Sequence, residues 1–318
     1  MNPLVTAVIP THNRPDLVQR AIRSALNQTY ANLEVIVVVD GPEPETVKLL
    51  EALREPRLRV IELQENVRCS EARNTGVRAA RGEWIASLDD DDEWMPEKIA
   101  RQVEVAARAD PSTNFICCRY ELRNNSTIIM RPRRFPHAGE DWSEFVYVHG
   151  EDLLPGSQAL IQRSLLLRVP FTKGLPSNED VDWLLRAREA NAIVPEWMEE
   201  VLMVYHNESN VARLSKGSDW EFPYRWALEH RKTLLTPKAF SYCLVRISMC
   251  HIRQSQKPLR NSLLLLHKAI SLGRIDLRFC VFYLQYLCRF VLLDDNSKQK
   301  VKLFIRKMKP LVLQKDRR

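Results

Sequence analysis

Glycine and paired cysteines are scarce in this sequence of 318 residues, which contains 9 Gly. Its seven cysteines form no Cys-x-x-Cys pair and are scattered at positions 69, 117, 118, 243, 250, 280 and 288. Fibrous and low-complexity architectures need many glycines or a repeat, and both are missing. Zinc fingers and disulfide scaffolds need cysteines at paired spacings, which this sequence does not have. A reduced, cytoplasmic chain is therefore expected.

Long hydrophobic runs are lacking too. The longest, residues 279–293, spans 15 residues and includes Gln285 and Arg289. About 20 apolar residues are needed to cross a bilayer, so a buried or interfacial helix is the better interpretation. The first ten residues have no basic stretch ahead of an apolar core, and we therefore expect no secretory signal.

Acidic and basic residues are distributed unevenly. Residues 216–318 hold 22 Lys or Arg against 7 Asp or Glu, whereas residues 1–215 hold 25 against 33. This difference predicts two regions, 1–215 and a basic C-terminal region 216–318 that reads as helical. The basic region suits a polyanionic surface. It lacks a zinc finger or an aromatic stacking motif, so nucleic acid is not expected as a partner.

Strands and helices are predicted to alternate over about the first 120 residues. Short apolar runs predict strands at 5–10, 34–39, 59–63, 84–88 and 115–120, and helical spacing predicts helices at 14–28, 45–53, 70–80 and 96–109. This order indicates an α/β fold with an open, mainly parallel sheet flanked by helices. Functional residues are expected directly after the strands, because ligands bind beyond the carboxyl ends.

Four consecutive carboxylates, Asp89 to Asp92, follow the predicted strand at 84–88. Without a cation they would repel one another, and such oxygen ligands suit Mg²⁺ or Mn²⁺. The alternative is a solvated acidic turn ahead of the helix near Pro96.

Three further features have both a functional and a structural interpretation. Asp40 follows an apolar strand and is either a hydrogen-bond acceptor for a ligand or a turn residue before Gly41. Residues 66–76, which include Arg68, Arg73 and Asn74, form either an anion site at a helix N-terminus or a solvated helix face. Glu179 and Asp180 begin a helix, where carboxylates act as a general base or complement the helix dipole.

These elements occur in one order that strongly resembles the glycosyltransferase family 2 enzymes, over about residues 3–210. The matching segments are Val8–Arg14, Glu34–Gly41, Ala72–Gly76 leading to the Asp run, and Ser157–Arg163 leading to Glu179–Arg186. The resemblance implies a GT-A fold with a Rossmann-like mixed sheet, a nucleotide-sugar half at about 1–120 and an acceptor half at about 121–215.

Carried over residue by residue, the resemblance implies a donor site, a metal ligand and a base. The donor-binding residues would be Pro10, Thr11, Asp40, Arg73, Asp89 and Asp90. Asp91, the last member of an Asp-x-Asp motif, would hold Mn²⁺ or Mg²⁺. Asp180 would be the catalytic base, with Glu179 beside it on the acceptor side. His206 is interpreted as structural rather than as a metal contact.

The implied activity is inverting sugar transfer from a nucleotide sugar to a glycan or lipid-linked acceptor, in surface or capsular polysaccharide biosynthesis. A UDP-sugar is favoured, because Asp40 would accept the N3–H of uracil, while dTDP- and GDP-sugars remain open. A catalytically degenerate sugar- or nucleotide-binding scaffold is the alternative. A sugar-phosphate nucleotidylyltransferase is excluded, because residues 10–14 contain no glycine for a phosphate loop.

Residues 297–318 combine a helical apolar stripe with nine basic residues and one acid, Asp316. One interpretation is a peripheral anchor lying in an anionic membrane surface at the inner face of the cell membrane. The other is a helix that packs its stripe against residues 279–293. Pro310 would bend or end such a helix.

Overall fold

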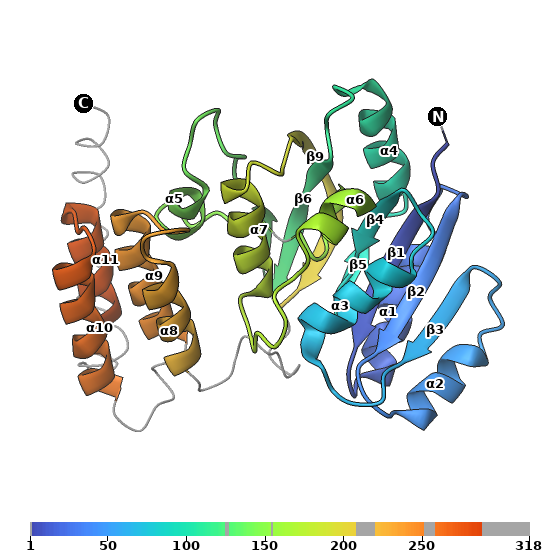
Figure 1. Cartoon of the computed structure of the whole chain (residues 1–318), viewed down its shortest axis with the longest axis horizontal. Coiled ribbons are helices and arrows are strands. Elements are labelled where there is room, and N and C mark those ends of the chain that lie inside the picture. The colour runs from blue at the N-terminus through green and yellow to red at the C-terminus, as the bar shows by residue number, and fades with distance from the viewer. Residues whose placement is uncertain (1, 125–126, 154, 208–219, 251–257, 288–318) are drawn as a thin grey trace. The chain divides into compact units, whose positions relative to one another are not determined.

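The computed structural model describes residues 2–124, 127–153, 155–207, 220–250 and 258–287 (Figure 1). The chain divides into two compact units. Unit 1 consists of residues 1–135 and 151–211, and unit 2 of residues 136–150 and 212–318.

Unit 1 contains one mixed β-sheet with helices on both faces. Its strands are β1 Val5–Thr11, β2 Leu33–Val39, β3 Leu58–Glu62, β4 Trp84–Ser87, β5 Asp92–Trp94, β6 Phe115–Asn124, β7 Thr127–Arg131, β8 Ala159–Gln162 and β9 Pro195–His206. Its helices are α1 Pro15–Leu26, α2 Pro44–Glu51, α3 Arg68–Ala79, α4 Lys98–Arg108, α6 Arg163–Arg168 and α7 Glu179–Glu189. The strand order is β3-β2-β1-β4-β8-β6-β9-β5, with β7 paired to β6.

The first half of this sheet is parallel and buried on both faces. Strand β1 pairs in parallel with β2 and β4, and β2 with β3. Every residue of β1 and β2 is buried, since alternate side chains pack against α1 on one face and α3 on the other. Continuous apolar runs are typical of such doubly covered strands. The predicted α/β class and flanking helices are confirmed.

Helix α3 approaches the sheet closely, and Figure 1 shows it in front of the parallel strands. Gly76 makes this approach possible, because a Cβ there would lie 2.3 Å from Cγ1 of Val8 and 3.4 Å from Cγ2 of Val38. Real side chains do not tolerate the shorter distance without displacement. The small residue therefore positions the helix that carries Arg73.

The second half of the sheet reverses direction. Strand β8 lies antiparallel between β4 and β6, β6 is parallel to β9, and β5 is antiparallel to β9. Because β8 runs opposite to β4, the segment that enters β8 lies at the carboxyl end of β4. Residues near 157 are thus brought to Asp89.

Two local expectations differ from the structure. Helix α3 begins at Arg68 rather than at Ser70, and Ser70 is buried inside its first turn instead of capping it. Residues Asp92 to Trp94 form strand β5 because they pair with Met203 to Tyr205 of β9. The helix that follows the Asp run is α4, which begins at Lys98.

Unit 2 is helical in its described part, with α5 Trp142–Tyr147, α8 Glu221–His230, α9 Pro237–Cys250, α10 Pro258–Leu272 and α11 Leu277–Leu287. Its core includes Phe240 and Leu244 of α9 and Phe279 of α11, all fully buried. Within the described residues, no helix is both long and apolar enough to cross a membrane. The predicted membrane segment 297–318 lies outside the described residues.

Candidate active site

One buried guanidinium joins two of the predicted site carboxylates. Arg73 of α3 has no exposed surface, and its Nη2 donates to Oδ1 of Asp89 at 2.6 Å. Its Nη1 donates to Oδ1 of Asp180 at 3.5 Å. Residues from α3, from α7 and from the segment directly after β4 thus meet at the carboxyl edge of the sheet, although they lie up to 107 positions apart in sequence.

Asp180 titrates unusually in this environment. Burial raises the pKa of Asp180 to about 7, with the neighbouring charges of Glu179 and Asp89 acting in the same direction. The Arg73 charge and a hydrogen bond from the backbone N–H of Gly156 oppose that increase in the pKa. A carboxylate with a pKa near neutrality is suited to accept a proton at physiological pH.

Asp90 and Asp91 face the other direction, toward β1 and α1. Oδ2 of Asp90 accepts a hydrogen bond from Thr11 Oγ1 at 2.8 Å, and Oδ1 accepts one from Arg14 at 2.9 Å. Arg14 also lies 3.5 Å from Oδ2 of Asp91. Burial raises the pKa of Asp90 to about 6 despite these contacts. Asp90 thereby links the motif to the end of β1, where Pro10 is also buried.

Asp40 lies next to the end of β1. Its backbone N–H donates to the carbonyl of Thr11 at 2.9 Å, and Oδ1 accepts the backbone N–H of Val67 at 2.7 Å. Burial raises the pKa of Asp40, while the N–H groups of Val67 and Arg68 act against it. The structure therefore groups Asp40 with Thr11 and Asp90, as one side of the site.

The residues of the Asp run fit a divalent cation that is shared with a substrate. In the described residues, no three His, Cys, Asp or Glu side chains are grouped as a complete protein cage. Mg²⁺ usually keeps several waters and binds through one or two carboxylates plus substrate phosphates, so a complete cage is not required. The side chain of Asp89 is 32% exposed and that of Asp91 13%, which leaves both partly accessible.

Two contacts were not foreseen from the sequence, and both come from the segment before β8. Ser157 Oγ accepts the backbone N–H of Asp89 at 3.1 Å, and Gly156 donates to Asp180. A Cβ at position 156 would lie 2.7 Å from Arg73 Nη2 and 2.9 Å from Asp180 Oδ1, so a larger residue there would displace these two side chains. A Gly-Ser pair just ahead of an apolar strand was the available signal.

His206 and Glu93 form a pair on the neighbouring strands β9 and β5. His206 Nε2 lies 2.5 Å from Glu93 Oε2. The contact is diagonal, since Glu93 pairs with Val204 and His206 lies two residues further along β9. This contact fits the structural interpretation of His206.

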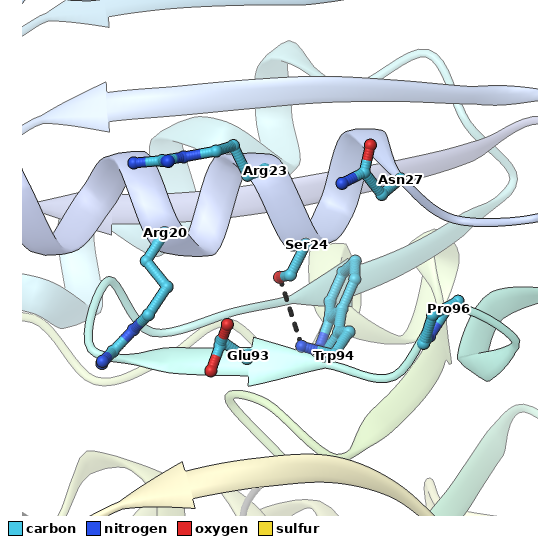
Figure 2. Close-up of a pocket in the computed structure, with 7 residues that line it drawn as sticks. All are labelled: Arg20, Arg23, Ser24, Asn27, Glu93, Trp94 and Pro96. Carbon is cyan, nitrogen blue, oxygen red and sulfur yellow. Dashed lines mark hydrogen bonds between the residues drawn. The ribbon is translucent and has the colours of Figure 1, made fainter.

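A cleft of about 440 Å³ lies beside α1 and β5, as Figure 2 shows. Arg20 of α1 extends toward β5 beside Glu93 and donates to the backbone carbonyl of Asp91 at 2.6 Å. Ser24 Oγ accepts the backbone N–H of Trp94 at 3.2 Å. The predicted site carboxylates are not among the residues that line the cleft. The cleft contacts the Asp run through Arg20, which binds the backbone of Asp91.

Comparison with known proteins defines the class. The sequence profile described as "Glycosyl transferase family 2" matches residues 6–169. This is more than half of the chain, and the protein belongs to that family.

Two relatives illustrate the similarity. An uncharacterized glycosyltransferase of Rickettsia prowazekii (strain Madrid E) is 32% identical over 186 residues, 57% of each protein. The succinoglycan biosynthesis protein ExoO of Rhizobium meliloti (strain 1021) is 44% identical over 107 residues, 34% of this chain and 31% of that protein. The chain thus matches little more than half of the length of the first relative and less of the second.

Solved structures share the fold. TarS residues 1–349 of S. aureus, in complex with UDP-GlcNAc, has a TM-score of 0.53 at 17% identity, over 90% of this chain and 80% of that one. The mannosyltransferase PcManGT from Pyrobaculum calidifontis, with GDP-Man and Mn²⁺, has a TM-score of 0.54 at 17% identity, over 97% and 81%. The expected GT-A fold is confirmed.

Proposed function

We propose that the protein is an inverting, metal-dependent glycosyltransferase that moves a sugar from a nucleotide sugar to a glycan or lipid-linked acceptor in surface polysaccharide biosynthesis. The observation that carries the proposal is the Arg73 guanidinium, which holds Asp89 and Asp180 together in a family 2 chain. The name of ExoO, a succinoglycan biosynthesis protein, supports the polysaccharide context.

Asp180 is the proposed base. Its raised pKa makes the carboxylate basic enough to take the proton of an acceptor hydroxyl while it remains partly ionised at neutral pH. The acceptor oxygen attacks the anomeric carbon, the bond to the nucleoside diphosphate breaks, and the configuration inverts in a single displacement. Glu179, one residue earlier on α7, is proposed to face the acceptor.

Mg²⁺ or Mn²⁺ is the proposed cofactor, with Asp91 as its ligand. When bound, such an ion neutralises the charge that builds on the leaving nucleoside diphosphate. Asp89 is ion-paired to Arg73 through Oδ1, and its other oxygen is proposed to face the donor. The Mn²⁺ complex of PcManGT supports a divalent ion in this fold.

A uridine nucleotide is the favoured donor. Asp40 has one oxygen fixed by Val67 and would accept the N3–H of uracil beside Pro10 and Thr11. UDP-GlcNAc bound to TarS and GDP-Man bound to PcManGT support a nucleotide sugar and leave the base open. Titration of UDP, dTDP and GDP by calorimetry with metal present tests the assignment, and a clear preference for GDP would remove it.

The decisive experiment incubates a panel of nucleotide sugars with the protein and measures donor hydrolysis and transfer, with and without chelator. Asp91→Ala should abolish turnover, and Asp110→Ala, an exposed carboxylate in the same unit, should not. Full activity in excess chelator would contradict metal dependence. Nucleotide binding without turnover of any donor would favour the degenerate scaffold instead.

The acceptor side includes a proposed membrane contact through residues 297–318. Their basic and apolar side chains support binding to an anionic surface. Co-sedimentation with anionic vesicles should fall when the chain is stopped at Asn296, and equal pelleting of both chains would assign the segment to the core.

A further inference from the structure

Unit 1 contains a fully buried lysine outside the proposed donor and acceptor residues. Lys98, the first residue of α4, has no exposed surface, and burial lowers the pKa of Lys98 to about 8. The ammonium therefore stays charged at neutral pH. A buried charge needs compensating contacts. Nζ of Lys98 donates to Oε1 of Gln102 at 2.8 Å and lies 4.5 Å from the centre of the Trp94 ring.

Both partners of Lys98 hold carbonyls of one short segment. Nε1 of Trp94 donates to the carbonyl of Ser157 at 3.0 Å, and Nε2 of Gln102 donates to the carbonyl of Gln158 at 2.8 Å. All five side chains are buried, Trp94 with 4% exposure and the others with none. Side chains of β5 and α4 thus hold two successive backbone carbonyls, those of Ser157 and Gln158.

The same segment also contacts Asp89 and Asp180 of the proposed site. Ser157 Oγ accepts the backbone N–H of Asp89, and the backbone N–H of Gly156 donates to Asp180. Residues 156–158 therefore connect the two carboxylates with the interior contacts of Lys98.

The charge of Lys98 gives Gln102 a defined orientation. Because the ammonium has donors and no acceptor, Gln102 must direct its oxygen toward Lys98 and its nitrogen toward the carbonyl of Gln158. Nε2 of Gln102 also donates to the carbonyl of Ile116 at 3.2 Å. An apolar residue at position 98 would leave Oε1 of Gln102 buried without its donor and remove one of the three contacts that orient the amide beside Gln158.

We propose that Lys98 is a positioning residue for sugar transfer, which acts through Trp94 and Gln102 to fix residues 156–158 and thereby the separation of Asp89 and Asp180. This inference rests on the proposed function of that site. A displacement of about 1 Å in such a site can reduce turnover about 100-fold.

The test compares three variants. Lys98→Met keeps the length of the side chain and removes its charge. Trp94→Phe keeps a ring and removes the donor to Ser157. Lys48→Met replaces an exposed lysine of α2 and serves as the control. Each is assayed for kcat, for donor KM, for Tm, and for hydrogen exchange at the backbone amides of Asp89 and Gly156.

Lys98→Met should still fold with only a small change in Tm, because removing the buried charge offsets the loss of the donor to Oε1 of Gln102. Its kcat should fall about 10–100-fold with donor KM unchanged. Exchange at the two amides should accelerate in Lys98→Met and Trp94→Phe and stay unchanged in Lys48→Met.

Unchanged kcat and exchange in both Lys98→Met and Trp94→Phe would overturn the proposal. A joint loss of Tm, kcat and donor affinity in both would also overturn it, since Lys98 would then only support the fold. The exchange measurement needs no turnover. A parent protein that transfers no sugar would therefore refute the proposed function while the exchange result still decides whether Lys98 fixes the segment.

Discussion

At the scale of single residues, the pKa of Asp180 is set by two opposing effects. Burial raises the pKa, and the nearby charge of Arg73 lowers it. Asp180→Asn keeps the shape of the side chain but cannot accept a proton, so kcat should fall about 10²–10⁴-fold with donor binding retained. Steady-state kinetics and donor titration check this, with Glu189→Gln, an exposed carboxylate at the other end of α7, as the control. If donor binding disappeared and turnover persisted, Asp180 would belong to the donor pocket.

The pH profile reports the pair formed by Arg73 and Asp180. As the proposed base, Asp180 would act in its ionised form, so kcat should rise with pH through about 7. Arg73 lowers the pKa of Asp180, and its removal in Arg73→Met should move this rise upward by about one pH unit or more. Arg78→Met, an exposed arginine of the same helix, should leave the profile in place. A downward move would contradict the assigned ion pair.

The positions of the carboxylates were accessible from sequence, whereas the environment of Arg73 was not. Asp40 and Asp89 follow apolar strands, and strand ends meet at one edge of a parallel sheet. Arg73 was assigned to the donor on its resemblance alone, and its complete burial between two acids depends on Asp180, which lies 107 positions later in the chain. Ser157 was named in a matching segment but not as a site residue, because only the reversed direction of β8 brings it to Asp89.

At the scale of elements, α3 is held against the sheet by the absence of a side chain at Gly76. Gly76→Ala should destabilise the fold by about 1–3 kcal/mol through overpacking against Val8, more than the gain of about 1 kcal/mol in helix propensity. Urea unfolding measures this. The cost should shrink in a Val8→Ala background, because the atom 2.3 Å away is then gone. If Gly76→Ala destabilised the fold equally in both backgrounds, contact with Val8 would not be the cause.

Element boundaries were predicted well where packing agrees with local pattern. Helix α1 and strands β2 and β3 lie within a few residues of their predicted ranges. Strand β5 was missed because three residues carry no period of their own, and its extended form depends on pairing with β9. Long-range pairing of this kind has no local signature.

At the scale of the whole molecule, buried carboxylates make stability depend on pH. The pKa values of Asp90, about 6, and Asp180, about 7, exceed the value of 3.8 for an ordinary Asp. The folded state therefore binds more protons than the unfolded state between about pH 4 and 7, and stability is lost as pH rises through this window.

Thermal unfolding without metal should consequently give a lower Tm at pH 8 than at pH 5.5. A difference of 1 kcal/mol corresponds to about 2–4 °C in domains of comparable size. Asp180→Asn should reduce the difference, since one of the two groups no longer titrates. A Tm that is equal or higher at pH 8 would show that these carboxylates do not govern the folding equilibrium.

The insertion of β8 between β4 and β6 also determines when the sheet is finished during synthesis. Strand β4 emerges from the ribosome with β1 beside it, but its second edge stays open until residues 159–162 have been made. An open edge invites pairing with other chains. A fragment ending near residue 120 should therefore self-associate, and residues 1–120 cannot be transplanted into another protein as a self-sufficient module without the strand that the later chain contributes.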